Sequence, residues 1–349
     1  MATLRSGWMT KKAEQFPLIS RRNLGRMLMA LAAGALDLRR SAAATALLEV
    51  DRFLNGLAGT DASRTSFTYR ADAVIVVLSV PVFRRTGVGS GFASLEQAVR
   101  GEERYSSLRF AGASRPERAA GLDRMGAIRE VVRERGAALS EAAYFGVLTS
   151  SSEETLEEGR RSLGKNANKW NEYTAIDGQS RYRLTRSAVA HFRLPAAEAP
   201  KLRVIAEARA NFQTSRPPWR ESRWPSDDLA PPTFLYALMR GIRRPQRTSE
   251  DWYVYSERSY RLRLEKEPDR QQGQRFAELG LTSRPDRVIE VRGRTREQRS
   301  GRQAAFRLWI EDGPENALPL RIEFQPRSYL RLSFEVDPQA ATTPLEEDL

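Results

Sequence analysis

The sequence predicts a mainly β protein of the α+β kind: a strongly curved antiparallel sheet, or half-barrel, with a few short helices packed on it. Three observations lead to this class. Most of the chain consists of segments rich in Val, Ile, Tyr and Phe, separated by polar or Gly/Pro turns, which is typical of antiparallel meanders. Only a few segments have the apolar spacing of a helix. The 349 residues suffice for a sizeable core, as one large domain or two smaller ones.

Residues 1–44 predict a cleaved export signal. Basic residues, Arg21 and Arg22 among them, precede an apolar run at 27–36 and a small-residue stretch at 41–46, the order found in secretory signals. As a helix the apolar run is only about 15 Å long, too short to span a membrane. The paired arginines resemble a bacterial twin-arginine signal. The alternative is a basic amphipathic helix retained in a cytoplasmic protein.

The β-rich domain is expected over residues 45–337, and it begins with a helix. Apolar residues at helical spacing over 47–57 predict that helix. The next segment, 67–83, is rich in Val, Ile and Tyr and predicts one long strand. Strands at 92–99 and 104–110 continue the meander.

A group of glycines lies between residues 87 and 91. It lacks the Lys-Ser/Thr of a phosphate-binding loop and the further spacing of a dinucleotide fingerprint. We therefore expect a hairpin turn with a glycine bulge at this place.

Residues 113–165 have the least regular pattern and leave open whether the domain has one sheet or two sub-sheets. Residues 127–135 fit a helix or a strand, and 144–148 fit a strand. A short helix is expected to begin at Ser151. Its first turns carry four glutamates, which favour a helix N-terminus; a metal cluster is the alternative: Glu153, Glu154, Glu157 and Glu158.

The second half of the chain returns to a β pattern. Alternating residues over 180–194 and 201–212 predict two strands. The segment that follows, 213–232, is rich in proline and tryptophan, which indicates a linker or surface loop. A helical apolar set predicts a helix over 233–242. Further strands are expected at 252–264, 288–295, 303–310, 318–324 and 329–336, followed by a frayed tail at 338–349.

The C-terminal part also carries a resemblance. A short helix precedes strands that end in Arg307-Leu308-Trp309-Ile310-Glu311-Asp312 and in Leu318-Pro319-Leu320-Arg321-Ile322. This series resembles uncharacterised periplasmic relatives of the lipoprotein-carrier (LolA/LolB-like) half-barrel superfamily. The resemblance covers about residues 230–337 and is architectural over 45–115. It implies a curved antiparallel sheet around an apolar cavity capped by helices, and it brings no catalytic motif.

The amino-acid composition excludes most of the common catalytic mechanisms. Without cysteine there is no thiol nucleophile or iron–sulfur cluster, and a single histidine excludes a multi-histidine zinc site. That residue, His191, has no nearby nucleophile in the sequence and is expected to be an ordinary side chain of a strand. No catalytic residue, cofactor or metal is therefore expected, and the protein is predicted not to be an enzyme.

The basic balance of the chain has two interpretations. The formal net charge is +13, which raises the alternative of a basic nucleic-acid-binding protein. Outside the N-terminal segment, however, arginines are interleaved with Glu and Asp. This pattern is typical of solvent-exposed faces in a protein whose composition is biased towards arginine. Nucleic acid is therefore not an expected partner.

The leading functional hypothesis is an exported, periplasmic protein that binds an apolar or lipid-like ligand, or an envelope partner, in its half-barrel without catalysis. No transmembrane anchor is expected after cleavage. A carboxylate-based envelope hydrolase is the alternative, because Asp and Glu are the abundant general acids. The candidate ligand-binding residues are the aromatic and apolar side chains Trp219, Trp224, Phe234, Leu238, Trp252 and Trp309.

The export signal generates the first prediction. Protein made in a bacterial host is expected to have a new N-terminus near Ala44 and to be recovered outside the cytosol, because signal peptides are removed after transport. N-terminal sequencing of the fractionated protein checks this. An intact N-terminus together with cytosolic recovery contradicts it.

Overall fold

A computed structural model of the chain describes residues 49–55, 62–77, 80–119, 123–136, 138–150, 170–195, 201–224, 230–255, 257–313, 318–327 and 330–339. All of them lie in one unit, Leu47–Leu349. The expected export signal, with Arg21 and Arg22, lies outside the described residues. So do the acidic helix after Ser151 and the tail beyond residue 339.

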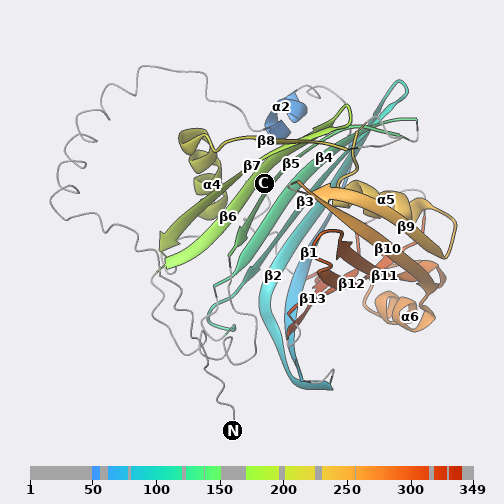
Figure 1. The fold of residues 1–349 in the computed structure, drawn as a ribbon. Helices are drawn as coiled ribbons and strands as arrows, with labels where there is room; N and C mark the ends of the chain where they lie inside the picture. The colour runs from blue at the N-terminus through green and yellow to red at the C-terminus, as the bar shows by residue number, and fades with distance from the viewer. Residues whose placement is uncertain are drawn as a thin grey trace, which may run out of the picture. The chain divides into compact units, whose positions relative to one another are not determined.

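The described residues form one open antiparallel sheet of fourteen strands, which confirms the predicted fold class (Figure 1). Its strand order is β8-β7-β6-β5-β4-β3-β2-β1-β14-β13-β12-β11-β10-β9. The strands are β1 (Ala62–Val77), β2 (Val80–Arg100), β3 (Glu103–Ser114), β4 (Met125–Arg135), β5 (Ala138–Thr149), β6 (Trp170–Arg181), β7 (Leu184–Pro195), β8 (Arg220–Arg223), β9 (Thr248–Tyr255), β10 (Arg258–Pro268), β11 (Val288–Glu297), β12 (Gln303–Glu311), β13 (Arg321–Arg327) and β14 (Leu330–Val336).

The first strand of the N-terminal half of the sheet pairs with the last strand of the C-terminal half. β1 pairs with β14, in a register that runs from Tyr69↔Val336 to Ile75↔Leu330. The N-terminal half, β1 to β8, and the C-terminal half, β9 to β14, therefore share one hydrogen-bonded sheet. The question of one sheet or two, which the pattern at 113–165 left open, is answered by this pairing.

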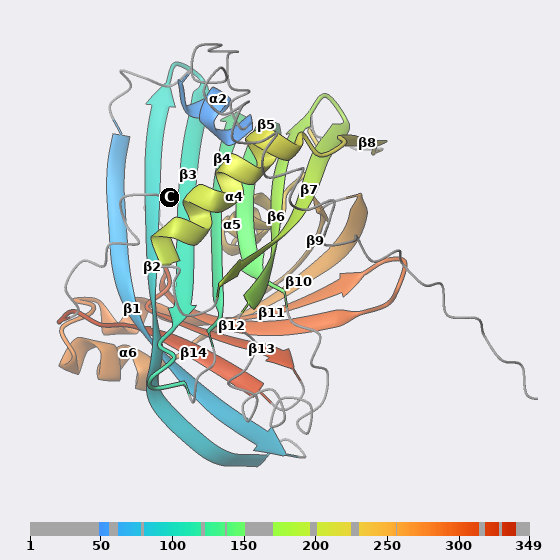
Figure 2. The ribbon, with the colours of Figure 1, turned by 90° about the vertical axis from the view of Figure 1, so that its left-hand side faces the viewer.

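Helices α2 (Glu49–Asn55) and α4 (Lys201–Ser215) cover one face of the N-terminal half (Figure 2). Phe53 of α2 and Ile205 of α4 pack on residues such as Val131 and Phe145. The buried residues of this cluster alternate along their strands with residues of the other face, so they point to one side of the pleated sheet. This face holds the largest group of buried apolar residues.

Helix α5 (Phe234–Arg243) lies between the two halves of the sheet. Its Tyr236 is buried against Val132 and Ala142 of the N-terminal half, on the face opposite α2 and α4. Its Ala237 is buried against strands β9 to β12 of the C-terminal half. The helix starts where expected, because the Thr233 side chain accepts a hydrogen bond from the backbone N–H of Tyr236 as an N-cap.

Helix α6 (Arg270–Glu278), which the sequence pattern missed, covers the other face of the C-terminal half. Its Phe276 is fully buried beside Trp309 and Leu320. The Asp269 side chain accepts a hydrogen bond from the backbone N–H of Gln272 and caps the helix. The helix has few apolar residues and a polar composition, so the periodic signal that reveals α5 is weak here.

The strand predicted at 201–212 is wrong, because this segment is the helix α4. Alternation of Leu202, Val204 and Ala206 suggested a strand. In the helix, the buried residues are instead Val204, Ile205 and Ala208, together with Phe212. This spacing of one, three and four residues places them on a single helical face.

Four further expectations require correction. The long strand predicted at 67–83 belongs to two strands, β1 and β2, which pair with each other. The glycine group at 87–91 is not a hairpin turn, since it lies inside β2. Its bulge is real: Gly87 has a φ of +63°, and the β1–β2 register shifts between Ala71 and Ala73. The strands predicted at 180–194 and 252–264 are likewise hairpins. The first includes a turn at Tyr182 and Arg183, and the second spans the paired strands β9 and β10.

One glycine of the sheet generates a stability prediction. A Cβ added at Gly293 would lie 2.0 Å from Cζ of Phe306, its cross-strand partner. Gly293→Val is expected to lower the free energy of unfolding by about 1–3 kcal/mol through overpacking. Gly126→Val in β4 is the control, because a Cβ there meets nothing within 4 Å. Equal losses in the two variants, measured by denaturant unfolding, would contradict this account.

Candidate functional site

The six predicted ligand-binding residues lie in four separate places. Phe234 and Leu238 are on α5 and pack against the C-terminal half of the sheet. Trp224 and Trp252 lie side by side, with ring centroids 6.4 Å apart. Trp219 is 4.4 Å from the guanidinium of Arg186 at the β7–β8 edge.

The sixth predicted residue, Trp309, lies on the opposite face of the C-terminal strands from α5. It is only 2% exposed, and its indole Nε1 donates a hydrogen bond of 2.9 Å to Asp269. The guanidiniums of Arg307 and Arg321 lie 4.7 and 5.1 Å from the ring centroid. Its surroundings are those of a packed structural side chain that joins the α6 N-cap to the sheet.

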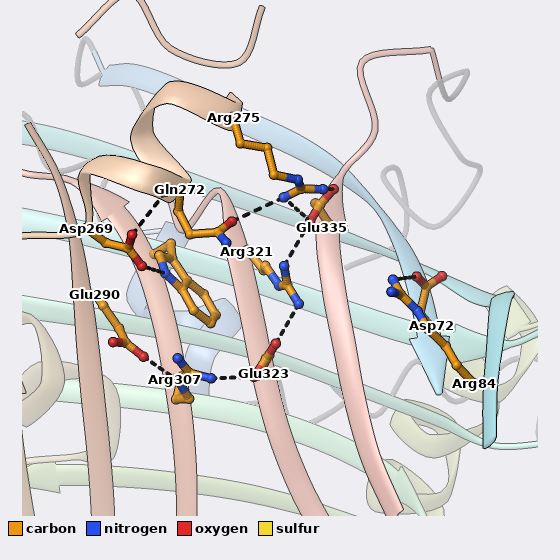
Figure 3. A network of polar contacts seen from close by, with 11 residues as sticks. Asp72, Arg84, Asp269, Gln272, Arg275, Glu290, Arg307, Arg321, Glu323 and Glu335 are labelled. Carbon is orange, nitrogen blue, oxygen red and sulfur yellow. Dashed lines mark hydrogen bonds and ion pairs between the residues drawn. The ribbon is translucent and has the colours of Figure 1, made fainter. Parts of the chain in front are cut away.

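A ladder of alternating arginines and glutamates crosses this same face (Figure 3). Arg307 and Arg321 both contact Glu323, at 3.2 and 2.6 Å. Arg321 also contacts Glu335 at 3.5 Å, and Arg275 of α6 holds the same carboxylate at 2.6 Å. The ladder continues through Glu290, a partner of Arg307.

Each carboxylate of this ladder is shared by two guanidiniums, which sets its electrostatics. Burial opposes ionisation of Glu290, but hydrogen bonds from Arg292 and Arg307 outweigh it and hold its pKa below the usual range. Glu335 raises the pKa of Arg275 by its hydrogen bond. Such mutually satisfied pairs are typical of a structural network that holds α6 on the sheet. We do not assign a ligand to it.

The face toward α5, called the inner face here, has an aromatic cluster. The rings of Tyr253 and Tyr260 stack with centroids 4.9 Å apart. Phe234 of α5 contacts Tyr253 edge to face at 5.2 Å and Phe306 at 5.9 Å. Of the predicted ligand residues, Phe234 thus has the most extensive aromatic surroundings.

From Phe306 a row of cross-strand partners runs over five neighbouring strands on the inner face. The register pairs Phe306 with Phe324, Phe324 with Leu332, Leu332 with Ala73, and Ala73 with Arg85. Antiparallel cross-strand partners point to the same face of a sheet. A second, shorter row pairs Leu330 with Ile75 and Ile75 with Phe83. The apolar strip is defined as Phe306, Phe324, Leu332, Ala73, Leu330, Ile75 and Phe83.

The apolar strip is only partly covered by the described residues. Phe324 is 39% exposed and Phe83 is 57% exposed, whereas phenylalanine side chains usually lie inside. Ile75, Leu330 and Leu332 are half-buried. Arg85, at the end of the longer row, makes no ion pair with a described residue. The arrangement can therefore accept an apolar chain along the strip and an anion at Arg85.

A buried carboxyl group lies under the N-terminus of α5. Glu130 of β4 accepts hydrogen bonds from the Thr233 hydroxyl and from the backbone N–H of Tyr236. Burial nevertheless dominates and raises the pKa of Glu130 to about 7. The same burial raises the pKa of the neighbouring Tyr255 to about 12. Because Glu130 is enclosed, its protonation acts on the packing of α5 against the sheet.

Sequence reasoning missed the apolar strip. The strands that hold Phe306, Phe324 and Leu332 were predicted, and the strip lies on their inward parity. What the sequence does not contain is the pairing of β14 with β1, which adds Ala73 and Ile75 to the same surface. Four of the six predicted ligand residues are tryptophans, and none of the three phenylalanines of the strip is among them.

Comparisons with known proteins give no family for this chain. No protein-family model, no curated protein and no solved structure matches it. Among the described residues, no group of three or more His, Asp or Glu side chains has an arrangement that could hold a metal ion. None of the helices described is long and apolar enough to cross a membrane.

The buried Glu130 generates a pH-dependence prediction. An unfolded glutamate loses its proton near pH 4.5, whereas folded Glu130 keeps it to about pH 7. The free energy of unfolding should therefore fall as pH rises from about 4.5 to 7. Glu130→Gln keeps an acceptor for Thr233 and removes the charge, so at pH 8 it is expected to be more stable than the wild type by about 1–3 kcal/mol.

At pH 4 the variant and the wild type are expected to differ little, because both then have a neutral side chain at this position. Glu250→Gln, an exposed position on β9, is the control and should leave the pH profile unchanged. Denaturant unfolding across this range measures the difference. If the free energy of unfolding of Glu130→Gln changes with pH as that of the wild type does, Glu130 is not the cause of the pH dependence.

Proposed function

We propose that the protein is an exported, non-enzymatic envelope protein that binds a fatty-acid-like ligand on the inner face of its sheet. The observation that supports the proposal is the apolar strip. Phe324 of its longer row and Phe83 of its shorter row are both exposed. Soluble proteins rarely leave contiguous apolar surface open without a use for it. The export part of the proposal rests on residues 1–44.

The dimensions and ends of the strip support an acyl chain as the occupant. The longer row crosses five strands, β12 to β2, and strand spacing of about 4.8 Å makes it about 19 Å long. This length suits a long acyl chain that lies flat. One end meets the aromatic ring of Phe234, and the other end meets Arg85, whose guanidinium suits a carboxylate headgroup.

The neighbouring helix α5 supports the same interpretation. Its Leu235, Tyr236 and Ala237 are buried against the sheet, so the helix closes one end of the inner face. Phe234 and Leu238, which are half-buried, border the strip on that side. A ligand on the strip would therefore contact two of the six residues that the sequence nominates, Phe234 and Leu238.

The test is displacement of a fluorescent fatty acid from delipidated, refolded full-length protein. Phe324→Ser and Phe83→Ser are each expected to weaken binding about tenfold or more, since a buried Phe ring contributes roughly 1.5–3 kcal/mol. Arg85→Met is expected to weaken binding of the acid and to leave binding of its methyl ester nearly unchanged, because the ester has no charge for Arg85 to hold.

Leu279→Ser provides the matched control. Leu279 is 48% exposed and ends α6, on the other face of the C-terminal strands, so its replacement should not change the affinity. Far-UV circular dichroism of each variant verifies folding. The proposal is overturned if the wild type shows no displaceable binding, or if Phe324→Ser and Leu279→Ser bind the probe equally well.

A further inference from the structure

Two carboxylates of the sheet are held by arginines of α5. Glu134 of β4 contacts Arg243 at 3.2 Å, and its side chain is only 7% exposed. Asp251 of β9 contacts Arg240 at 2.5 Å, and its side chain is 6% exposed. Each of these enclosed negative charges is therefore matched by a guanidinium of the helix, as buried charges need to be.

The carboxyl group of Glu130, which also lies under α5, has a different environment. It is 4% exposed, and of the described residues no arginine or lysine contacts it. Its hydrogen bonds come from the Thr233 hydroxyl and from the backbone N–H of Tyr236, which are uncharged donors at the start of the helix. A buried carboxyl group without a cation resists ionisation, so the protonated form suits this position.

The groups that face Glu130 from the neighbouring elements supply no opposite charge. Its cross-strand partners are Leu108 of β3 and Tyr144 of β5. Tyr255 of β9 stacks on Tyr144 with ring centroids 5.8 Å apart, and burial raises the pKa of Tyr255 to about 12. Burial also raises the pKa of Tyr260 on β10, which interacts with Tyr255. The arginines of α5 are engaged in the two ion pairs above.

The two ends of α5 are thus held by contacts of different kinds. The last turns carry the ion pairs of Arg240 and Arg243, and Nζ of Lys266 donates a hydrogen bond of 2.9 Å to the carbonyl of Ile242. The first turn instead rests on the uncharged hydrogen bonds to the Glu130 carboxyl group. A change of charge at Glu130 therefore acts on the first turn, while the ion pairs hold the other end.

The first turn of α5 also borders the apolar strip. Phe234 is the first residue of the helix, and its ring contacts Phe306 of the strip edge to face, with centroids 5.9 Å apart. Thr233, which donates to Glu130, directly precedes Phe234. A shift of this turn therefore moves the aromatic ring at one end of the strip.

We propose that Glu130 makes α5 a proton-controlled latch of the apolar strip. With a protonated carboxyl group, the first turn stays packed and Phe234 borders the strip. An ionised carboxylate favours a state in which this turn moves away and water reaches Glu130. An acyl ligand that contacts Phe234 binds the packed state more tightly, so its affinity falls as pH rises through neutrality. The inference rests on the proposed function, because it concerns the ligand of the strip.

The latch couples ligand binding to proton binding. If protonation of Glu130 strengthens the binding of a ligand, the ligand must strengthen protonation of Glu130 by the same factor. Burial raises the pKa of Glu130 to about 7. At neutral pH the protein should therefore take up a fraction of a proton when the ligand binds.

The experiment measures the affinity of the full-length protein for a fluorescent fatty-acid methyl ester between about pH 5.5 and 8.5. The ester has no ionisable group, so its own charge stays constant. The wild type is expected to bind it at least about fivefold more tightly at the acidic end, which is the lower limit of typical couplings between sites. Glu130→Gln is expected to bind it equally well at both ends, because the amide stays neutral.

Calorimetry in buffers of different ionisation enthalpy measures the proton uptake. Uptake is expected for the wild type near pH 7 and not for Glu130→Gln, since linkage requires a titrating group. Glu250→Gln, at an exposed position of β9, is the control. It should keep both the proton uptake and the pH-dependent affinity of the wild type.

Amide hydrogen exchange of the ligand-free protein distinguishes a failed latch from a failed ligand site. As pH rises through 7, protection factors in the first turn of α5 are expected to fall in the wild type and to stay constant in Glu130→Gln, while those of α4 stay constant in both. This exchange pattern without any binding of the ester supports the latch and overturns the proposed ligand. The latch is overturned if exchange in this turn, or binding of the ester, changes with pH equally in the wild type and in Glu130→Gln.

Discussion

The burial of helix α5 between the two halves of the sheet is the packing on which the rest of the described structure depends. Tyr236 packs on β4 and β5, while Ala237 packs on β9 to β12. A fourteen-stranded sheet with one uncovered face would expose a large apolar area, and α5 covers its centre. Its position requires Glu130 to lie under its first turn, where burial raises the pKa of that carboxyl.

The pairing of β1 with β14 is the second constraint. It joins strands separated by most of the chain, and it brings Ile75 and Ala73 next to Leu330 and Leu332. Helix α5 reaches only part of the inner face, so the far strands keep their apolar side chains partly open. The apolar strip is thus a consequence of a short helix on a wide sheet.

Arginine–carboxylate pairs occur in two regions of the face of the sheet that α2, α4 and α6 cover. Under α6, each of Glu290, Glu323 and Glu335 contacts two arginines. Under α2 and α4, Arg209 contacts Asp51 at 2.9 Å and Arg109 contacts Glu96 at 3.5 Å. The sequence does not reveal these pairs, because the partners come from different strands and helices.

The sequence by itself determined the β class, helix α5 and most C-terminal strands, because the periodicity of apolar residues is a local property. It misassigned α4, whose Val204 and alanines fit both periods, and it missed α6, whose polar composition hides its period. Nor did it place Trp309, which belongs to a strand predicted correctly but lies on the face away from Phe234. The tertiary structure alone decided the β1–β14 pairing, the apolar strip and the arginine–glutamate ladder, because each depends on contacts between residues far apart in the chain.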